Sequence, residues 1–152
     1  MSENDLEEVA LLERLCFSDP WSKTSFEEEL NHRFSIPLVV KSGQKVIGYT
    51  CLWHIYDQIE IANFAVSPEF RGKGIGKIMM ERVLSEAKKR GCLSVMLSVR
   101  KSNLTALNLY AKSGFVEVDR RKNYYRHPTE DAIIMVKNLE RQWTDSRHQT
   151  AD

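Results

Sequence analysis

The stretch VSPEFRGKGIGK, residues 66–77, joins a segment that alternates like a β-strand to a segment with helical periodicity. Its three glycines, Gly72, Gly74 and Gly76, allow the backbone to approach a ligand closely and to aim several N–H groups at one point. The positive end of the helix dipole and the neighbouring basic side chains favour an anion at that point. The stretch therefore predicts a strand–turn–helix unit that binds phosphate groups, with a diphosphate as the first candidate.

The glycine spacing excludes the two common nucleotide-binding motifs. Gly76 and Lys77 could end a Walker A loop, but that motif needs a glycine where Arg71 stands, and serine or threonine where Ile78 stands. A GxGxxG fingerprint lacks its third glycine from either possible start. The spacing that remains is Arg-x-x-Gly-x-Gly over residues 71–76. Taken alone, this short pattern is also compatible with a turn that only lets a helix pack on a strand.

Periodicity elsewhere predicts, in order, two helices, three strands, a helix, a strand, a helix and two strands. Short turns join the first three strands, so these should be antiparallel, whereas a helix separates the third strand from the fourth, so these two should be parallel. The order predicts an α/β (α+β) fold with a mixed sheet flanked by helices. The expected helices cover residues 5–17, 22–32, 74–90 and 103–114, and the expected strands cover residues 36–41, 46–55, 59–66, 93–99, 115–121 and 132–137.

Length and composition are those of one soluble domain. The chain has 152 residues, of which 42% are hydrophobic and 28% charged, and its net charge is +1. We expect a single domain over residues 1–139 and a polar, flexible tail over residues 140–152. Interleaved charges give no nucleic-acid surface, and no apolar run approaches the roughly 20 residues of a membrane helix. Three isolated cysteines indicate reduced thiols in a cytoplasm, and no Cys/His spacing predicts a metal site.

Several separate motifs occur in the order typical of one enzyme family. Besides the turn, they are residues 19–22 (DPWS), 63–68 (NFAVSP), 99–103 (VRKSN), 109–110 (LY) with 114–115 (GF), 121–125 (RKNYY) and 130–135 (EDAIIM). Over nearly its whole length the chain resembles the GNAT acetyltransferases and, among them, the RimI-like N-terminal acetyltransferases. The resemblance implies the GNAT fold. The usual first strand of that fold is short or absent here, because helix-like sequence begins by Asp5.

The resemblance also implies acetyl-coenzyme A as the donor. The backbone of residues 64–66 would pair with the pantetheine arm like an added strand, and an N–H there, that of Val66, would polarise the thioester carbonyl. Residues 72–77 would bind the pyrophosphate, and Asn103 would contact coenzyme A beyond a splay between the parallel strands. Tyr110 would protonate the departing thiolate; the alternative is an aromatic of the core. The implied cofactor-binding residues are Phe64, Ala65, Val66, Arg71, Gly72, Lys73, Gly74, Ile75, Gly76, Lys77 and Asn103.

One position departs from the family pattern. RimI-like enzymes have Leu-Glu-Val-Arg with the glutamate as general base, whereas residues 97–100 read LSVR, and the Ser98 hydroxyl does not titrate usefully near neutral pH. Either the base has moved, the substrate needs little help, or activity is lost. A moved base has a candidate in Glu60, at the offset where the histone-acetyltransferase branch carries its glutamate; the alternative is a solvent-facing residue. Strand alternation predicts that Glu60, Ala62 and Phe64 share one face.

The acceptor is the least determined part of the reaction. An α-amine has a pKa of about 7.7–8.0 and a lysine about 10.4, so roughly a tenth of α-amines, but well under a thousandth of lysines, are neutral near pH 7. A weak or water-relayed base could therefore suffice for an N-terminal amine.

By resemblance, the expected partner is the N-terminus of a ribosomal protein, whose amine attacks the thioester directly. Residues 17–21 and the loop with Tyr124 and Tyr125 would frame it, unless these tyrosines are ordinary strand-end aromatics. A lysine or small-amine acetyltransferase and a catalytically silent coenzyme A-binding module are the alternatives. We expect a monomer or a weak homodimer.

Overall fold

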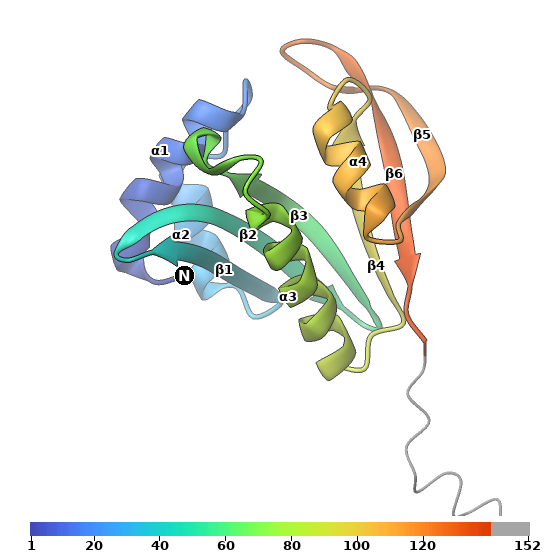
Figure 1. The fold of residues 1–152 in the computed structure, drawn as a ribbon, viewed down its shortest axis with the longest axis horizontal. Coiled ribbons are helices and arrows are strands. Elements are labelled where there is room, and N and C mark those ends of the chain that lie inside the picture. Colours follow the sequence, from blue (N-terminus) through green and yellow to red (C-terminus); the bar gives the residue numbers. More distant parts are fainter. Residues whose placement is uncertain (141–152) are drawn as a thin grey trace, which may run out of the picture.

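The computed structural model describes residues 1–140, so most of the predicted tail lies outside the described residues. It confirms the α/β class and the predicted order of elements (Figure 1). The elements are η1 (Glu3–Asp5), α1 (Leu6–Cys16), α2 (Lys23–Asn31), β1 (Ser35–Ser42), β2 (Lys45–Ile55), β3 (Gln58–Val66), η2 (Pro68–Phe70), α3 (Ile75–Lys89), β4 (Ser94–Arg100), α4 (Leu104–Lys112), β5 (Val116–Tyr125) and β6 (Glu130–Asn138), where η marks a 3-10 helix.

The strands form one six-stranded mixed sheet in the order β1-β2-β3-β4-β6-β5. The β1–β2 and β2–β3 pairs are antiparallel and the β3–β4 pair is parallel, as the connections predict. The β4–β6 and β5–β6 pairs are antiparallel. Helices α1 and α2 cover one face of the sheet, and α3 and α4 lie on the other (Figure 1). Each face has its own apolar core: Val83 and Val95 belong to the α3–α4 core, and Phe26 and Tyr49 to the α1–α2 core.

The two parallel strands separate part-way along their length. β3 and β4 pair only from Gln58 opposite Ser94 to Ile61 opposite Leu97. Beyond this point β3 continues along β2, and β4 continues along β6, so the sheet opens into a wedge between them (Figure 1). Because neither strand loses its outer partner, the wedge exposes backbone on its inner edges without unravelling the sheet.

A β-bulge in β3 reverses the predicted alternation. Asn63 lies opposite Cys51 and Ile61 opposite the next residue of β2, so Ala62 is an extra residue. The expectation that Glu60, Ala62 and Phe64 share one face is therefore wrong. Phe64 packs with Ile61 on the α3–α4 core, whereas Asn63 reaches α1 on the opposite face. A bulge shifts the side chains beyond it by one residue, and nothing local in the sequence marks its position.

Helix starts follow their local signals. The Ser22 side chain accepts a hydrogen bond from the Ser25 amide, and the Trp21 and Phe26 rings lie 5.4 Å apart, as a capped and stapled helix requires. Asn103 caps α4 in the same way.

The N-terminus also matches its prediction. Within residues 1–140 no strand precedes α1; instead the Met1 ammonium group donates to the carbonyl of Pro37 on β1, 3.2 Å away. No helix of this part of the chain is both long and apolar enough to cross a membrane.

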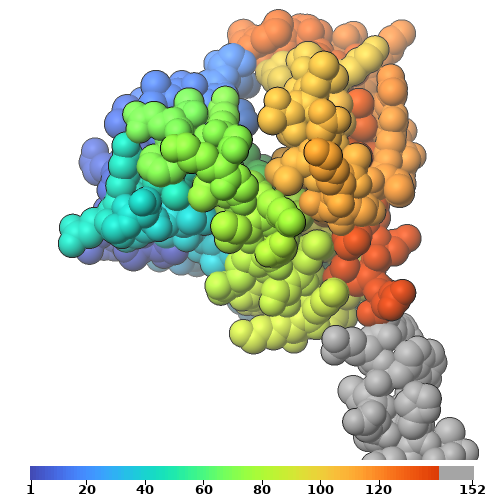
Figure 2. Space-filling view, in the orientation of Figure 1, coloured from blue at the N-terminus to red at the C-terminus, as the bar shows by residue number. Residues whose placement is uncertain are grey.

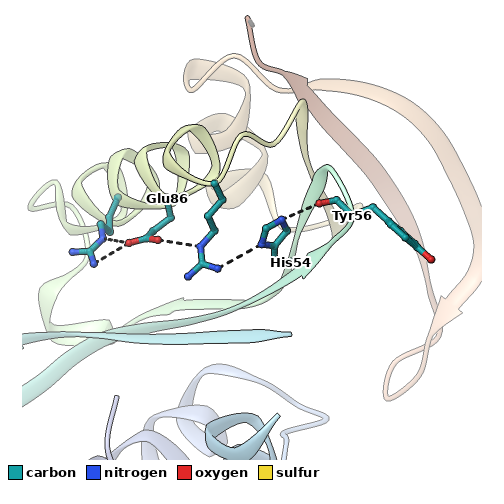
Figure 3. Close-up of polar contacts among 5 residues, drawn as sticks. His54, Tyr56 and Glu86 are labelled. Atoms are coloured by element: carbon teal, nitrogen blue, oxygen red, sulfur yellow. Dashed lines mark hydrogen bonds and ion pairs between the residues drawn. The ribbon is translucent and has the colours of Figure 1, made fainter. Parts of the chain in front are cut away.

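Polar contacts fix the C-terminal half of α3 on the β2–β3 hairpin (Figure 3). Glu86 accepts hydrogen bonds from Arg82 at 3.1 Å and from Arg90 at 3.3 Å. Burial raises the pKa of Glu86, but the hydrogen bonds from Arg90 and Arg82 outweigh it and hold the pKa below its ordinary value. Arg90 in turn lies 3.5 Å from His54 Nδ1, and His54 Nε2 lies 2.9 Å from the carbonyl of Tyr56. These contacts hold one end of α3, while its first turn lies at the wedge.

Candidate active site

A cleft of about 530 Å³ opens on the α3–α4 side of the wedge, and we call it the turn half of the site. It is visible in Figure 2 as the hollow between the green atoms that precede α3 and the amber atoms of α4. All of the predicted cofactor-binding residues except Lys73 line it. The lining residues are Cys16, Phe17, Phe64, Ala65, Val66, Phe70, Arg71, Gly72, Gly74, Ile75, Gly76, Lys77, Asn103, Thr105, Ala106, Leu109 and Tyr110.

The turn before α3 adopts a backbone that glycine permits. Gly72 and Gly74 have φ values of +76° and +81°, in the left-handed region, and Gly74 is the N-cap of α3. A Cβ atom on Gly76 would lie 3.1 Å from the Leu109 side chain of α4, so a larger residue would require that side chain to shift. The first N–H groups of a helix have no partner within it. Bare backbone donors therefore lie at the positive end of the α3 dipole, an arrangement that fits a diphosphate.

The basic residues of the turn differ in position. Arg71 donates through Nε to the Val66 carbonyl at 3.2 Å and lies 3.5 Å from Cys16 Sγ, so it fastens the turn to β3 and α1 while it lines the cleft. Lys77 lines the cleft from α3. The ammonium group of Lys73 lies over the Phe70 ring, 5.1 Å from its centroid, and outside the lining.

The inner edge of β3 offers backbone groups to the wedge. The Ser67 amide donates to the Ile47 carbonyl of β2 at 2.8 Å. Because backbone groups alternate in direction along a strand, those of Ala65 also face β2, whereas those of Phe64 and Val66 face the gap that β4 has left. An extended ligand can pair with this edge as an added strand, which is the arrangement predicted for the pantetheine arm.

A second cavity of about 550 Å³ lies on the α1–α2 side of the wedge, and we call it the loop half. Five residues line both halves, so the two cavities meet inside the wedge; they are Cys16, Phe17, Phe64, Asn103 and Tyr110. The other residues of the loop half are Glu13, Ser18, Asp19, Trp21, Ile61, Ala62, Asn63, Leu97, Ser98, Val99, Arg100 and Tyr125. Both predicted framing segments contribute, although Tyr124 and Tyr125 end β5 instead of lying in the loop after it.

Tyr110 lies at the junction of the halves. Its side chain is only 7% exposed and its ring is 6.0 Å from the centroids of both Phe64 and Phe115. Burial, with a smaller contribution from Tyr125, raises the pKa of Tyr110 above its ordinary value. The phenol therefore stays protonated at neutral pH. No residue in the described part of the chain is hydrogen-bonded to its hydroxyl group, so the group can donate a proton into the cleft.

The predicted base, Glu60, and Ser98, which takes the place of the family glutamate, differ in their relation to the loop half. Ser98 lines it, whereas Glu60 lines neither half. Glu60 pairs with Met96 across the parallel strands, and Ser98 follows Met96 by two residues, so Glu60 and Ser98 project from the same face. Ser98 therefore lies one side-chain position beyond Glu60, toward the open end of the wedge. The carboxylates that line the loop half are Glu13 and Asp19.

A comparison of the sequence with protein-family profiles matches residues 6–115 to the acetyltransferase (GNAT) family. The chain belongs to the GNAT acetyltransferases. Its activity is acetyl-CoA-dependent N-acetyl transfer. A relative from Bacillus subtilis (strain 168) is 35% identical over 136 residues, which cover 89% of this chain and 90% of the relative. The [ribosomal protein bS18]-alanine N-acetyltransferase of Escherichia coli (strain K12) is 32% identical over 140 residues, covering 90% and 93%.

Solved structures agree with the sequence relatives. The crystal structure of the ribosomal-protein-S18-alanine N-acetyltransferase from Escherichia coli superimposes with a TM-score of 0.85 at 28% identity and covers 95% of each chain. A GNAT acetyltransferase from Elizabethkingia anophelis with acetyl-CoA bound has a TM-score of 0.68 at 25% identity, over 78% of this chain and 84% of that one. Acetyl-CoA is thus a ligand that this fold holds.

Glu13 is the residue of this GNAT site that sequence reasoning missed. Its carboxylate is 2% exposed and accepts three hydrogen bonds: from the Tyr49 hydroxyl at 2.8 Å, the Asn63 amide side chain at 2.8 Å and the Trp21 backbone N–H at 2.9 Å. It therefore ties α1, β2, the bulged end of β3 and the α1–α2 loop together. A glutamate among the apolar positions of an amphipathic helix was the available signal.

Arg100 anchors the other wall of the loop half. Its guanidinium donates to the carbonyls of Pro128 at 2.9 Å and Arg126 at 2.8 Å, and it forms an ion pair with Glu130 at 3.3 Å. It also lies over the Tyr125 ring, 4.6 Å from the centroid. Burial is the main reason that the pKa of Tyr125 rises to about 12. The end of β5 thus presents a neutral phenol to the site.

Gly74→Ala tests the turn. A Cβ atom at its left-handed φ should cost about 1–2 kcal/mol of stability and, by displacing backbone donors, should weaken coenzyme A binding about tenfold in titration calorimetry. Gly43→Ala is the matched control, because Gly43 is also left-handed with open space around it but lies in the β1–β2 hairpin. Equal affinities in the two variants would contradict the assignment of the turn to the diphosphate.

Glu13→Gln tests the buried carboxylate. The amide would place an N–H₂ group against one of three donors, so we expect a loss of about 1–3 kcal/mol in the free energy of unfolding, measured by urea denaturation. The acceptor KM should rise more than the KM for acetyl-CoA, because the Trp21 loop loses its anchor. Glu7→Gln, an exposed change on the same helix, should leave the midpoint and both KM values near wild type. If Glu13→Gln has the wild-type midpoint of urea denaturation, the carboxylate does not stabilise the contacts between these segments.

Proposed function

We propose that this enzyme acetylates the N-terminal α-amine of an acceptor protein, with acetyl-CoA in the turn half and the acceptor N-terminus in the loop half. The observation that carries the proposal is the junction of the two cavities at Tyr110 and Phe64. A thioester that follows the inner edge of β3 and an amine that enters from the loop half would meet there. By similarity to the bS18-alanine N-acetyltransferases, we infer a ribosomal protein N-terminus as the acceptor.

The chemistry needs few groups from the protein. The neutral amine attacks the thioester carbon, a C–N bond forms, the C–S bond breaks and coenzyme A leaves as a thiolate. The N–H of Val66, which faces the wedge, stabilises the carbonyl oxygen as it becomes negative. The attacking nitrogen, positively charged once the C–N bond has formed, loses a proton to water or to a base, which leaves the neutral amide. Tyr110 gives its proton to the thiolate and regains one from solvent.

The walls of the loop half favour an N-terminal amine over a lysine. Ser98 takes the place of the family glutamate, and the carboxylate of Glu13 already accepts three hydrogen bonds. A site with so little basic assistance suits an amine of which roughly a tenth is already neutral near pH 7. We propose Glu60 as the remaining base, acting through water beside Ser98.

Three further parts of the proposal rest on sequence. A cytoplasmic location follows from the unpaired cysteines and a monomer or weak homodimer from the resemblance. No role is assigned to a metal ion, because the histidines and cysteines lack ligand spacing.

The function is tested by mass spectrometry of peptide products. Peptides with a free N-terminal alanine, the same peptides with a blocked N-terminus and an internal lysine, and spermidine are incubated with acetyl-CoA. Acetylation confined to the free α-amine is the expected result. Modified lysine or spermidine would favour the alternative acceptors, and coenzyme A binding without any product would indicate a silent module.

Tyr110→Phe should lower kcat by about a hundredfold and leave the affinity for coenzyme A unchanged, because only the proton donor is lost. Steady-state kinetics with a thiol reagent and titration calorimetry measure the two quantities. Tyr56→Phe is the control, since this tyrosine is 95% exposed. A wild-type kcat for Tyr110→Phe would remove Tyr110 as the acid.

Glu60→Gln should flatten the acidic limb of the pH–rate profile. A base must be deprotonated to act, so in the wild type the rate falls as the pH drops through the pKa of that base, and a glutamine removes this dependence. Asp19→Asn, which alters the exposed carboxylate of the loop half, is the comparison. If Asp19→Asn flattens the limb and Glu60→Gln does not, the base is Asp19.

A further inference from the structure

A further cavity, of about 450 Å³, lies between α2 and the end of β2 and adjoins the loop half. Trp21 lines both cavities, so its indole forms the wall between them. The α2 residues of this cavity recur at helical spacing on one side of the helix. The lining residues are Trp21, Ser25, Glu28, Glu29, His32, Phe34, Trp53 and Ile55.

Glu29 is the unusual residue of this cavity. The residue is only 8% exposed. Within residues 1–140, its carboxylate accepts a hydrogen bond from one donor alone, the Trp53 indole N–H, which lies 2.9 and 3.1 Å from the two carboxylate oxygens. No basic side chain in this part of the chain forms an ion pair with it. A buried carboxylate without a cation or a full set of donors bears a desolvation cost that a single indole N–H offsets only in part.

The other buried carboxylates of the described residues have more hydrogen-bond or ion-pair partners than Glu29. Glu86 is also 8% exposed and is bonded to two arginines, Glu13 has three donors, and Asp5 pairs with Lys41 at 2.8 Å. Glu29 alone among these four carboxylates lacks both a cation and a third donor. It lines its cavity together with Glu28, a second acid.

Aromatic side chains also line this cavity and can bind a cation through their ring faces. The Trp21 and Trp53 rings are stacked, with centroids 6.5 Å apart and planes at 16°. His32, the one basic residue of the lining, has its Nδ1 occupied as the acceptor for the Phe34 N–H. A carboxylate at the base of an aromatic wall suits a guanidinium, which can bond a carboxylate through two N–H groups and stack its plane on an indole.

We propose that this cavity is a specificity subsite for a basic side chain of the acceptor peptide, arginine before lysine, downstream of the reacting amine. The proposal rests on the proposed function, because the loop half is then the route by which the peptide reaches Trp21. The guanidinium would supply the charge that Glu29 lacks, with Glu28 adding attraction at the cavity mouth. The subsite would thus select an acceptor by a residue that takes no part in the chemistry.

The test uses the full chain and a set of peptides with a free N-terminal alanine. Arginine, or its neutral isostere citrulline, occupies the second, third or fourth position of otherwise identical peptides. At one of these positions the wild type should prefer arginine about tenfold in kcat/KM, as a charge-assisted pair predicts. Glu29→Gln should reduce this preference to about twofold while it leaves the citrulline peptide unaffected. Glu27→Gln, on the exposed side of α2, should keep it.

Glutamine at position 29 retains an oxygen for the Trp53 indole, and a thermal melt confirms the fold of the variant. Glu28→Gln, at the cavity mouth, is a second variant and should give a partial loss of preference. No preference at any position, or the same preference in Glu29→Gln and the wild type, would overturn the subsite.

Binding of N-acetylated product peptides, measured by titration calorimetry, separates this proposal from the proposed function. Tighter binding of the arginine peptide that depends on Glu29, without any turnover, would support the subsite and overturn the function. Turnover with no arginine preference would support the proposed function and overturn the subsite. If spermidine is acetylated with a KM that depends on Glu29, the cavity serves a small amine and not a peptide.

Discussion

The buried carboxylate of Glu13 is the contact on which the active site depends. It joins segments that lie far apart in the sequence, since Trp21, Tyr49 and Asn63 all donate to it. Three donors offset the cost of burying a charge in a domain interior, and they also fix where the α1–α2 loop lies relative to the bulged end of β3. One wall of the loop half and one edge of the turn half are therefore held by the same group.

The wedge between β3 and β4 follows from how the sheet is paired. Each strand keeps its outer neighbour, so separation after Ile61 and Leu97 costs only the few hydrogen bonds between the two strands. The freed edge of β3 then offers donors and acceptors in the spacing of a strand, which suits an extended ligand. The same opening connects the two faces of the sheet, so a donor on one side and an acceptor on the other can meet at Tyr110.

The electrostatics of the two halves differ. The turn half offers backbone N–H groups, the dipole of α3 and the side chains of Arg71 and Lys77 to an anion. The loop half is mixed in charge. It is lined by two tyrosines, by Ser98, by the guanidinium of Arg100 and by the carboxylates of Glu13 and Asp19. The cavity beyond Trp21 is acidic, in contrast to the basic turn half, because Glu28 and Glu29 line it. An anionic donor and a cationic acceptor would thus each find the charge they need.

The sequence by itself determined the features that depend on neighbours along the chain. The glycines of residues 71–76, the helical and strand periodicities and the short or helical connections predicted the phosphate-binding turn, the ranges of the elements and the mixed sheet. These follow from backbone freedom, local hydrogen bonds and chain reach, which a few adjacent residues decide.

Only the tertiary structure decided which side chains share a face or a pocket. The bulge at Ala62 moved Phe64 to the face opposite Glu60, because register is set by pairing with β2 and not by β3 alone. Contacts with residues distant in sequence give Glu13 its three hydrogen-bond donors. Contacts of the same kind bury Glu29 without a cation. Those contacts exist only once the helices pack on the sheet, so no local pattern could predict them.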